Sequence, residues 1–172
     1  IPSLYSLGII YMKNEDSDDA ASNFKAILKI DPDNHDAHYN MGVLYYKDEK
    51  YDDAITEFKE ALDKRNENAD IYYNMGLAYF KKKLFEDAIS SFKNTLKTKN
   101  KHVDALHELG NSYNSIGNHE KAISLFNKVL TLSPNNATCY FNLGNAYRTD
   151  KKRNEAHSAY KKAIEIFKLV ID

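Results

Sequence analysis

The sequence predicts an all-α fold of stacked helical hairpins, because one residue pattern recurs every 34 positions and each copy shows helical periodicity. Three columns, which begin at Tyr11, Ala20 and Phe24, keep this spacing. Five of the six glycines also keep it; they are Gly8, Gly42, Gly76, Gly110 and Gly144. Four columns with one period indicate five tandem copies, at residues 1–34, 35–68, 69–102, 103–136 and 137–170.

Each copy reads as two amphipathic helices joined by a polar turn. In the second copy, apolar residues over 37–45 follow the i, i+3/i+4, i+7 spacing of a helix. A polar segment, 47–50, separates this stripe from a second one over 51–62. Pro32 and Pro134 end the first and fourth copies, because proline cannot continue a helix. A single hairpin cannot bury both of its faces, so the copies are expected to stack.

The small residues of the repeat have a predicted packing role. Gly8 and Ala20 leave no side chain in the way where the two helices of a copy press together. Tyr11 and Phe24 are then expected to fill the space on either side.

The pattern resembles the tetratricopeptide repeat (TPR) family over the whole chain. Position 7 of each copy also matches that family; it carries Leu7, Met41, Met75, Leu109 and Leu143. The tryptophan often found at position 4 is replaced; the residues there are Leu4, His38, Tyr72, Leu106 and Tyr140. The resemblance implies a right-handed α-solenoid over 1–172, whose first helices line a concave groove. It also implies that the protein binds peptides or partner proteins without catalysis.

Composition narrows the classes of function. The 24 Lys and Arg balance 25 Asp and Glu to a net charge of −1, so a nucleic-acid partner is not expected. No apolar run approaches the roughly 18–20 residues of a membrane-spanning helix, so no membrane partner is expected either. The single cysteine fits a reducing compartment, and an intracellular, cytoplasmic location is expected. The chain begins with Ile1 rather than Met and is expected to be a fragment of a longer protein.

No constellation in the sequence indicates an enzyme, so no catalytic residue, metal or cofactor is expected. Phosphate-binding, nucleophile-elbow and zinc motifs are missing from the sequence. His35 and His38 are close, but no cysteine or further histidine joins them. His107 and Glu108 are adjacent and so point about 100° apart on a helix. Cys139 occupies position 3 of its copy and reads as a packing residue.

The resemblance places positions 2, 5, 6, 9, 12 and 13 of each copy in the groove. Position 6 carries Asn40, Asn74 and Asn142, interrupted by Glu108. In family members that hold extended peptides, asparagines at this position bind the ligand backbone. An amide suits this because it offers a donor and an acceptor together. A groove-facing amide such as Asn74 is expected to contribute little to the stability of the fold.

Aromatic and charged side chains accompany this row. The aromatics at positions 5 and 12 either pack on a ligand or pack between helices, and both alternatives stay open. Aspartates begin the first helices and lysines end them. These charges either complement the helix dipole or form an acidic and a basic edge that orient a peptide. The predicted groove residues are Tyr39, Asn40, Tyr46, Lys47, Tyr73, Asn74, Phe80, Lys81, Asn111, Phe141, Asn142, Asn145 and Arg148.

The leading hypothesis is a protein–protein interaction scaffold that binds an extended peptide or partner protein in the concave groove. Two alternatives stay open, namely a substrate-recruiting arm of a larger enzyme such as a glycosyltransferase, and a self-association module. Lys168 replaces the terminal proline, so the last helix is expected to continue to about Val170. Its apolar residues cover more than one face, so a further segment or a neighbouring chain is expected to cover this C-terminal helix.

Overall fold

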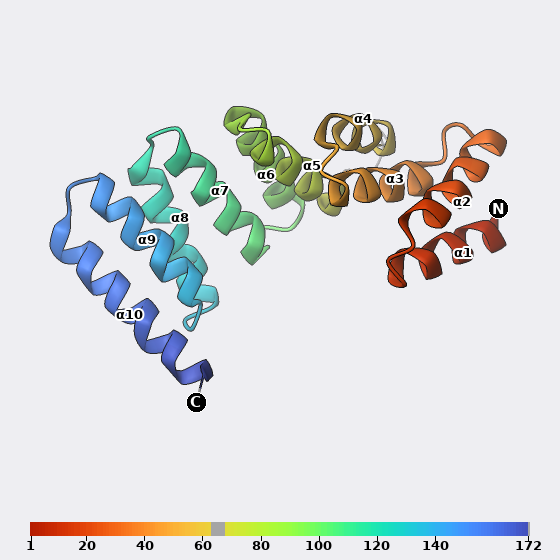
Figure 1. Cartoon of the computed structure of the whole chain (residues 1–172). Coiled ribbons are helices and arrows are strands. Elements are labelled where there is room, and N and C mark those ends of the chain that lie inside the picture. Colours follow the sequence, from red (N-terminus) through yellow and green to blue (C-terminus); the bar gives the residue numbers. More distant parts are fainter. Residues whose placement is uncertain (63–67, 172) are drawn as a thin grey trace. The chain divides into compact units, whose positions relative to one another are not determined.

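The computed structural model describes residues 1–62 and 68–171, apart from the side chains of residues 170 and 171. Within these ranges the chain forms ten α-helices and no strand, which confirms the all-α prediction (Figure 1). The helices are α1 (Pro2–Lys13), α2 (Ser17–Ile30), α3 (His35–Lys47), α4 (Tyr51–Ala61), α5 (Ala69–Lys81), α6 (Phe85–Thr98), α7 (Val103–Ser115), α8 (His119–Leu132), α9 (Ala137–Thr149) and α10 (Arg153–Ile171). The last helix runs past Val170, as predicted.

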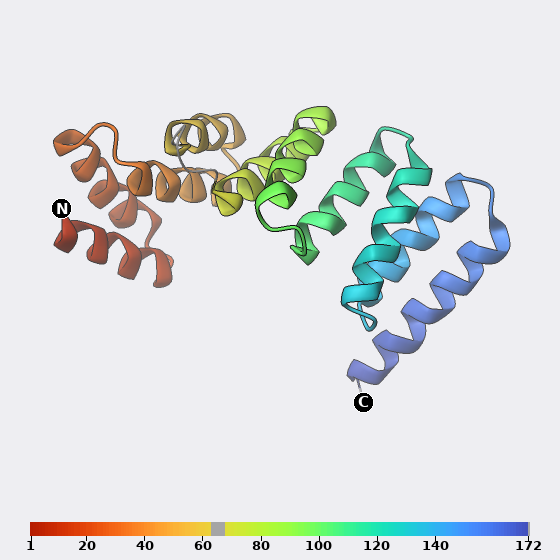
Figure 2. The same ribbon diagram turned by 180° about the vertical axis from the view of Figure 1, so that it is seen from behind.

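The helices form two compact units, Ile1–Lys83 and Leu84–Asp172. In the first unit each helix from α1 to α5 packs against the next, and in the second unit the same holds from α6 to α10 (Figure 2). The first helices of consecutive copies also touch, since α3 contacts α5 and α7 contacts α9. Within each unit the helices therefore stack in chain order, as the repeat predicts.

Polar side chains set where the first helices begin. The side chain of Asn34 accepts a hydrogen bond from a backbone N–H three residues further on, at 3.0 Å, and Asn136 does the same at 2.9 Å. His102 caps α7 in the same way, with Nδ1 as the acceptor at 3.2 Å. Such caps satisfy N–H groups that have no partner inside the helix.

The turn inside each hairpin contains one residue with left-handed backbone geometry. These residues, spaced by 34, are Glu15, Glu49, Lys83, Gly117 and Lys151, with φ between +60° and +81°. A residue with a side chain costs about 1–2 kcal/mol in this conformation, and only the fourth copy uses glycine there.

A missing Cβ atom sets the distance between the two helices of a hairpin. A Cβ added to Gly42 would lie 2.6 Å from the ring of Phe58, and one added to Gly8 would lie 2.8 Å from the ring of Phe24. In the last two copies, a Cβ added to Gly110 would lie 2.7 Å from the ring of Phe126, and one added to Gly144 would lie 2.5 Å from the ring of Tyr160. The glycine therefore makes room between the helices as predicted, and the group that needs this room is the ring at position 24.

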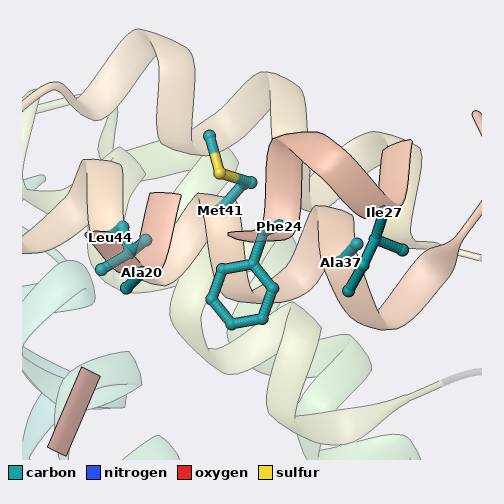
Figure 3. Packing of buried hydrophobic residues seen from close by; sticks show 6 residues of the cluster. All are labelled: Ala20, Phe24, Ile27, Ala37, Met41 and Leu44. Carbon is teal, nitrogen blue, oxygen red and sulfur yellow. The ribbon is translucent and has the colours of Figure 1, made fainter. Parts of the chain in front are cut away.

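The core continues from one copy to the next. In the first unit, six buried side chains of α2 and α3 form one cluster (Figure 3); they are Ala20, Phe24, Ile27, Ala37, Met41 and Leu44. Tyr11 packs against this cluster, as its column predicts. Residues at positions 20, 24 and 27 of one copy thus meet residues at positions 3, 7 and 10 of the next.

His38 ties α3 to the turn before it and to α4. Its Nδ1 lies 2.7 Å from Oε2 of Glu57, and its Nε2 lies 2.8 Å from the carbonyl oxygen of Pro32. Only the doubly protonated ring satisfies an acceptor at each nitrogen. Burial lowers the pKa of His38, but the hydrogen bonds to Glu57 and Pro32 and the charges of Glu57 and Glu60 raise it more. The pKa therefore lies above its ordinary value.

We predict that His38→Gln destabilises the protein most at acidic pH. Because folding raises the pKa, the protonated ring contributes its full stability below pH 6.5, and this contribution is lost as the pH rises through the folded-state pKa. Urea unfolding should show a loss of about 1–3 kcal/mol near pH 5.5 and a smaller loss near pH 9. His157→Gln, exposed on α10, is the control. An equal loss at every pH would contradict the prediction.

We also predict that Gly42→Ala destabilises the protein, although alanine favours a helix interior over glycine by about 1 kcal/mol. The added Cβ overlaps the ring of Phe58, and overpacking of this kind costs about 1–3 kcal/mol. Urea unfolding measures the difference. In a Phe58→Leu background the same change should cost less, and a stabilising effect of Gly42→Ala alone would show that the ring does not constrain this position.

Candidate functional site

The predicted groove residues lie on the first helix of a repeat, in both units. On α3 and α5 they form what we call the unit-1 surface, namely Tyr39, Asn40, Tyr46, Lys47, Tyr73, Asn74, Phe80 and Lys81. On α7 and α9 they form the unit-2 surface, namely Asn111, Phe141, Asn142, Asn145 and Arg148. The contacts of α3 with α5 and of α7 with α9 bring each set together within its own unit.

The asparagines of the unit-1 surface bridge consecutive first helices. Asn74 Nδ2 donates to the hydroxyl of Tyr39 at 2.9 Å and so joins α5 to α3. Asn40 Nδ2 donates to the hydroxyl of Tyr5 at 3.4 Å and to the carbonyl oxygen of Asp36 at 2.7 Å. Both side-chain pairs join position 5 of one copy to position 6 of the next, 35 residues apart.

These hydrogen bonds change the interpretation of the asparagine row. Asn40 is only 5% exposed and uses its NH₂ group twice within the chain, so a ligand reaches it less readily than the half-buried Asn74. The bond to Tyr39 also gives Asn74 a contact within the chain, so we expect Asn74 to contribute more to stability than the sequence indicates. The signal that could have revealed this is the pairing of a tyrosine at position 5 with an asparagine at position 6 of the following copy.

Two of the predicted aromatic residues at position 5, Tyr39 and Phe141, pack inside their own hairpins. Ring centroids of Tyr39 and Phe58 lie 6.1 Å apart, and those of Phe141 and Tyr160 lie 5.8 Å apart. At position 12, Tyr46 packs on a tyrosine of α4 at 5.6 Å. Packing between helices is thus the observed role, although Phe141 stays 49% exposed and keeps a face for a ligand.

The first unit is hollowed near both ends of α3. Near the start of α3, a hollow of about 390 Å³ is bordered by Asp31, Asp33, Asp36 and Tyr39, among others. Near its end, a hollow of about 400 Å³ is lined by Ile9, Met12, Lys13, Glu15 and Lys47. Carboxylates therefore gather at one end of α3, and lysines gather at the other. Lys47 and Lys81 are exposed, as is Arg148 at the corresponding end of α9.

The unit-2 surface contains a hydrogen-bonded polar cluster that the sequence did not reveal. Asn142 Nδ2 lies 3.0 Å from Nε2 of His107 and donates to Oδ1 of Asn111 at 3.0 Å. Asn111 Nδ2 in turn donates to Oε2 of Glu108 at 3.1 Å. Nδ1 of His107 lies 3.3 Å from Oε1 of Glu108 and 3.5 Å from Nδ2 of Asn111. Nearby, Asn145 Oδ1 accepts from the hydroxyl of Tyr160 at 2.8 Å.

The isolated chemical candidates have structural roles. Cys139 is fully buried, and burial raises the pKa of its thiol to about 12, so it is a packing residue. His35 lies against the carbonyl oxygen of Glu60, apart from the contacts of His38. Among the described residues, no group of three or more His, Cys, Asp or Glu is placed to hold a metal. Over the same residues, no helix is both long and apolar enough to cross a membrane.

Family models match four overlapping segments of the chain. Models described as tetratricopeptide repeat match residues 11–57, 69–102 and 102–168, and one described as TPR repeat matches residues 45–83. No curated protein sequence matches the chain.

Solved structures match nearly the whole chain. A crystal structure of MamA is 30% identical, covers 96% of each chain and superposes with a TM-score of 0.89. A second MamA structure is 29% identical, with a TM-score of 0.89, and covers 96% of this chain and 90% of that one. YrrB, described as a TPR protein with an unusual peptide-binding site, is 23% identical, has a TM-score of 0.87 and covers 95% of this chain and 84% of its own.

Proposed function

Because this chain belongs to the tetratricopeptide repeat family, whose solenoid fold it shares, we propose that it is a protein-interaction scaffold. It holds an extended peptide, or an extended segment of a partner protein, against the first helices of its repeats. It acts by binding and not by catalysis.

The main support for the proposal is that side-chain carbonyl oxygens of asparagines at position 6 of the repeat stay open to a ligand. In the described part of the chain, no donor lies within hydrogen-bond distance of Oδ1 of Asn74 or Asn142. No side-chain oxygen there is both buried and without a partner. These oxygens therefore face solvent, while their NH₂ groups hold them in place. Each unit thus presents a carbonyl oxygen that is held in place and is suited to accept a hydrogen bond from a main-chain N–H group of a ligand.

The charges around the unit-1 surface give the bound segment a direction. The aspartates border the hollow near the start of α3, and Lys13 and Lys47 border the one near its end. A segment that reaches both hollows is therefore bound best when its basic residues face the aspartates and its acidic residues face the lysines. A recruiting arm of a larger enzyme would use the same surface.

We predict that Asn74→Ala weakens binding of a peptide that is selected on the unit-1 surface. Peptides are selected from a phage library of random dodecamers, and their affinities are measured by fluorescence anisotropy. Loss of the ligand hydrogen bond should weaken binding about 5- to 30-fold, which corresponds to about 1–2 kcal/mol. Asn127→Ala, on an exposed face of α8, should leave the affinity unchanged.

Tyr39→Phe separates binding from stability, because it removes the bond to Asn74 but keeps the asparagine carbonyl and the packed ring. It should lower the free energy of unfolding by about 0.5–1.5 kcal/mol, as Asn74→Ala should also do, and should cost less affinity than Asn74→Ala. Equal losses of affinity would mean that Asn74 acts only through the fold. A library that yields no binder would refute peptide binding by the chain.

Exposed apolar side chains on α10 favour a second candidate function, self-association. Ala156, Ala159, Ala163 and Ile166 are buried, so one face of the helix is covered. Ile164, Phe167 and Leu169 remain 54%, 48% and 79% exposed. The side chain of Val170, which the sequence analysis placed on the same apolar surface, lies outside the described residues.

We predict that Ile164→Glu combined with Phe167→Glu shifts any dimer of this chain to monomer, since both charges would be buried in such a contact. Sedimentation velocity at several concentrations measures the shift. Lys161→Glu, exposed on the same helix, is the control for charge alone. A chain that is monomeric at every concentration before mutation would rule out self-association through α10.

A further inference from the structure

The second unit departs from the repeat in its charges. The first helices α3 and α5 each carry one aspartate and one lysine, so their formal charges cancel. Helix α7 carries Asp104 and Glu108 and no lysine or arginine. Glu108 also stands at position 6, where the second, third and fifth copies have asparagine. Next to the unit-2 surface, Glu108 therefore places a carboxylate at the repeat position where those copies have an uncharged amide.

The NH₂ groups of the cluster are directed at other members of the cluster and not at solvent. Asn142 directs its NH₂ group at Asn111 and His107, which uses both hydrogens. Asn111 directs its NH₂ group at Glu108, and Nδ1 of His107 also lies beside Glu108, at 3.3 Å from Oε1. Oδ1 of Asn142 has no donor in the described part of the chain and is not buried. The group that the cluster offers to a ligand is thus an acceptor, next to a carboxylate.

We propose that this cluster is a binding site for a basic side chain, a lysine ammonium or an arginine guanidinium, of the segment held against the unit-2 surface. The proposal rests on the proposed function. Glu108 supplies the negative charge, and Asn142 Oδ1 supplies a neutral acceptor. Asn111 and His107 are positioning residues, because they orient the carboxylate and the amide. A basic group supplies only donors, which matches a surface of acceptors.

Arg148 limits where the basic residue binds. It lies six residues after Asn142 on the same helix, a rise of about 9 Å, and is exposed. A cation is therefore favoured beside Glu108 and repelled beside Arg148. We expect peptides that bind here to carry a basic residue next to Glu108 and a neutral or acidic residue toward Arg148.

The experiment uses the whole chain and the phage library of random dodecapeptides. Peptides are selected on the wild-type chain and on Glu108→Gln, which keeps the size of the side chain and removes its charge. The wild type should enrich a set of peptides with Lys or Arg that Glu108→Gln does not enrich, whereas basic peptides held at the aspartates of the first unit should appear in both selections. Identical enrichment in both selections would overturn the basic site. A synthetic form of the best peptide should lose at least tenfold in affinity when its basic residue becomes citrulline or glutamine. Exchange between Arg and Lys separates the two sources of the basic group.

The outcomes separate the two proposals. Enriched peptides without a basic preference, or a peptide unaffected by citrulline, would overturn the basic site and leave peptide binding intact. A library that enriches nothing would overturn both. If Glu108→Gln fails to fold, salt dependence replaces it. Raising the salt concentration from about 0.05 to 0.5 M should weaken binding of the basic peptide severalfold and leave the affinity of its citrulline form unchanged. Equal salt dependence of the two affinities would overturn the basic site.

Discussion

The close contact between a glycine and an aromatic ring is the constraint on which the other features depend. At Gly42 and Phe58, any side chain on the first helix would occupy the volume of the ring, so the two helices of the hairpin take one separation. The ring then reaches the next copy, as Phe24 does beside Met41 (Figure 3). The spacing within a hairpin and the stacking between hairpins thus come from the same side chain.

The residue at position 5 connects this core to the surface. Tyr39 packs its ring on Phe58 and accepts a hydrogen bond from Asn74 at its hydroxyl. The amide that faces solvent is thus oriented by a ring that belongs to the core. In the second unit, His107 replaces the tyrosine and keeps both contacts, with Phe126 and with Asn142. The chemistry of the surface therefore changes between units without a change in the packing beneath it.

Most of the fold was predictable because its determinants repeat. Gly42 and Phe58 recur every 34 residues, and residues that recur in this way occupy the same backbone position in each hairpin, whatever residues surround them. The candidate site was less predictable, because members of one column differ in surroundings. Asn40 bonds to a carbonyl of its own helix and is nearly enclosed, whereas Asn74 keeps an exposed carbonyl. The contact of His38 with Glu57, 19 residues away, exists only once α4 folds back on α3.

The pairing of position 5 with position 6 across 35 residues has a consequence for how such a chain evolves. Each copy with tyrosine and asparagine carries an acceptor for the copy that follows and a donor for the copy that precedes it. A duplicated copy therefore joins its parent without any new side chain, and the array can lengthen by gene duplication alone. A copy with glutamate at position 6, such as the fourth, brings no amide donor to the new junction. A change at position 6 of a repeat thus limits its use as a template for further growth.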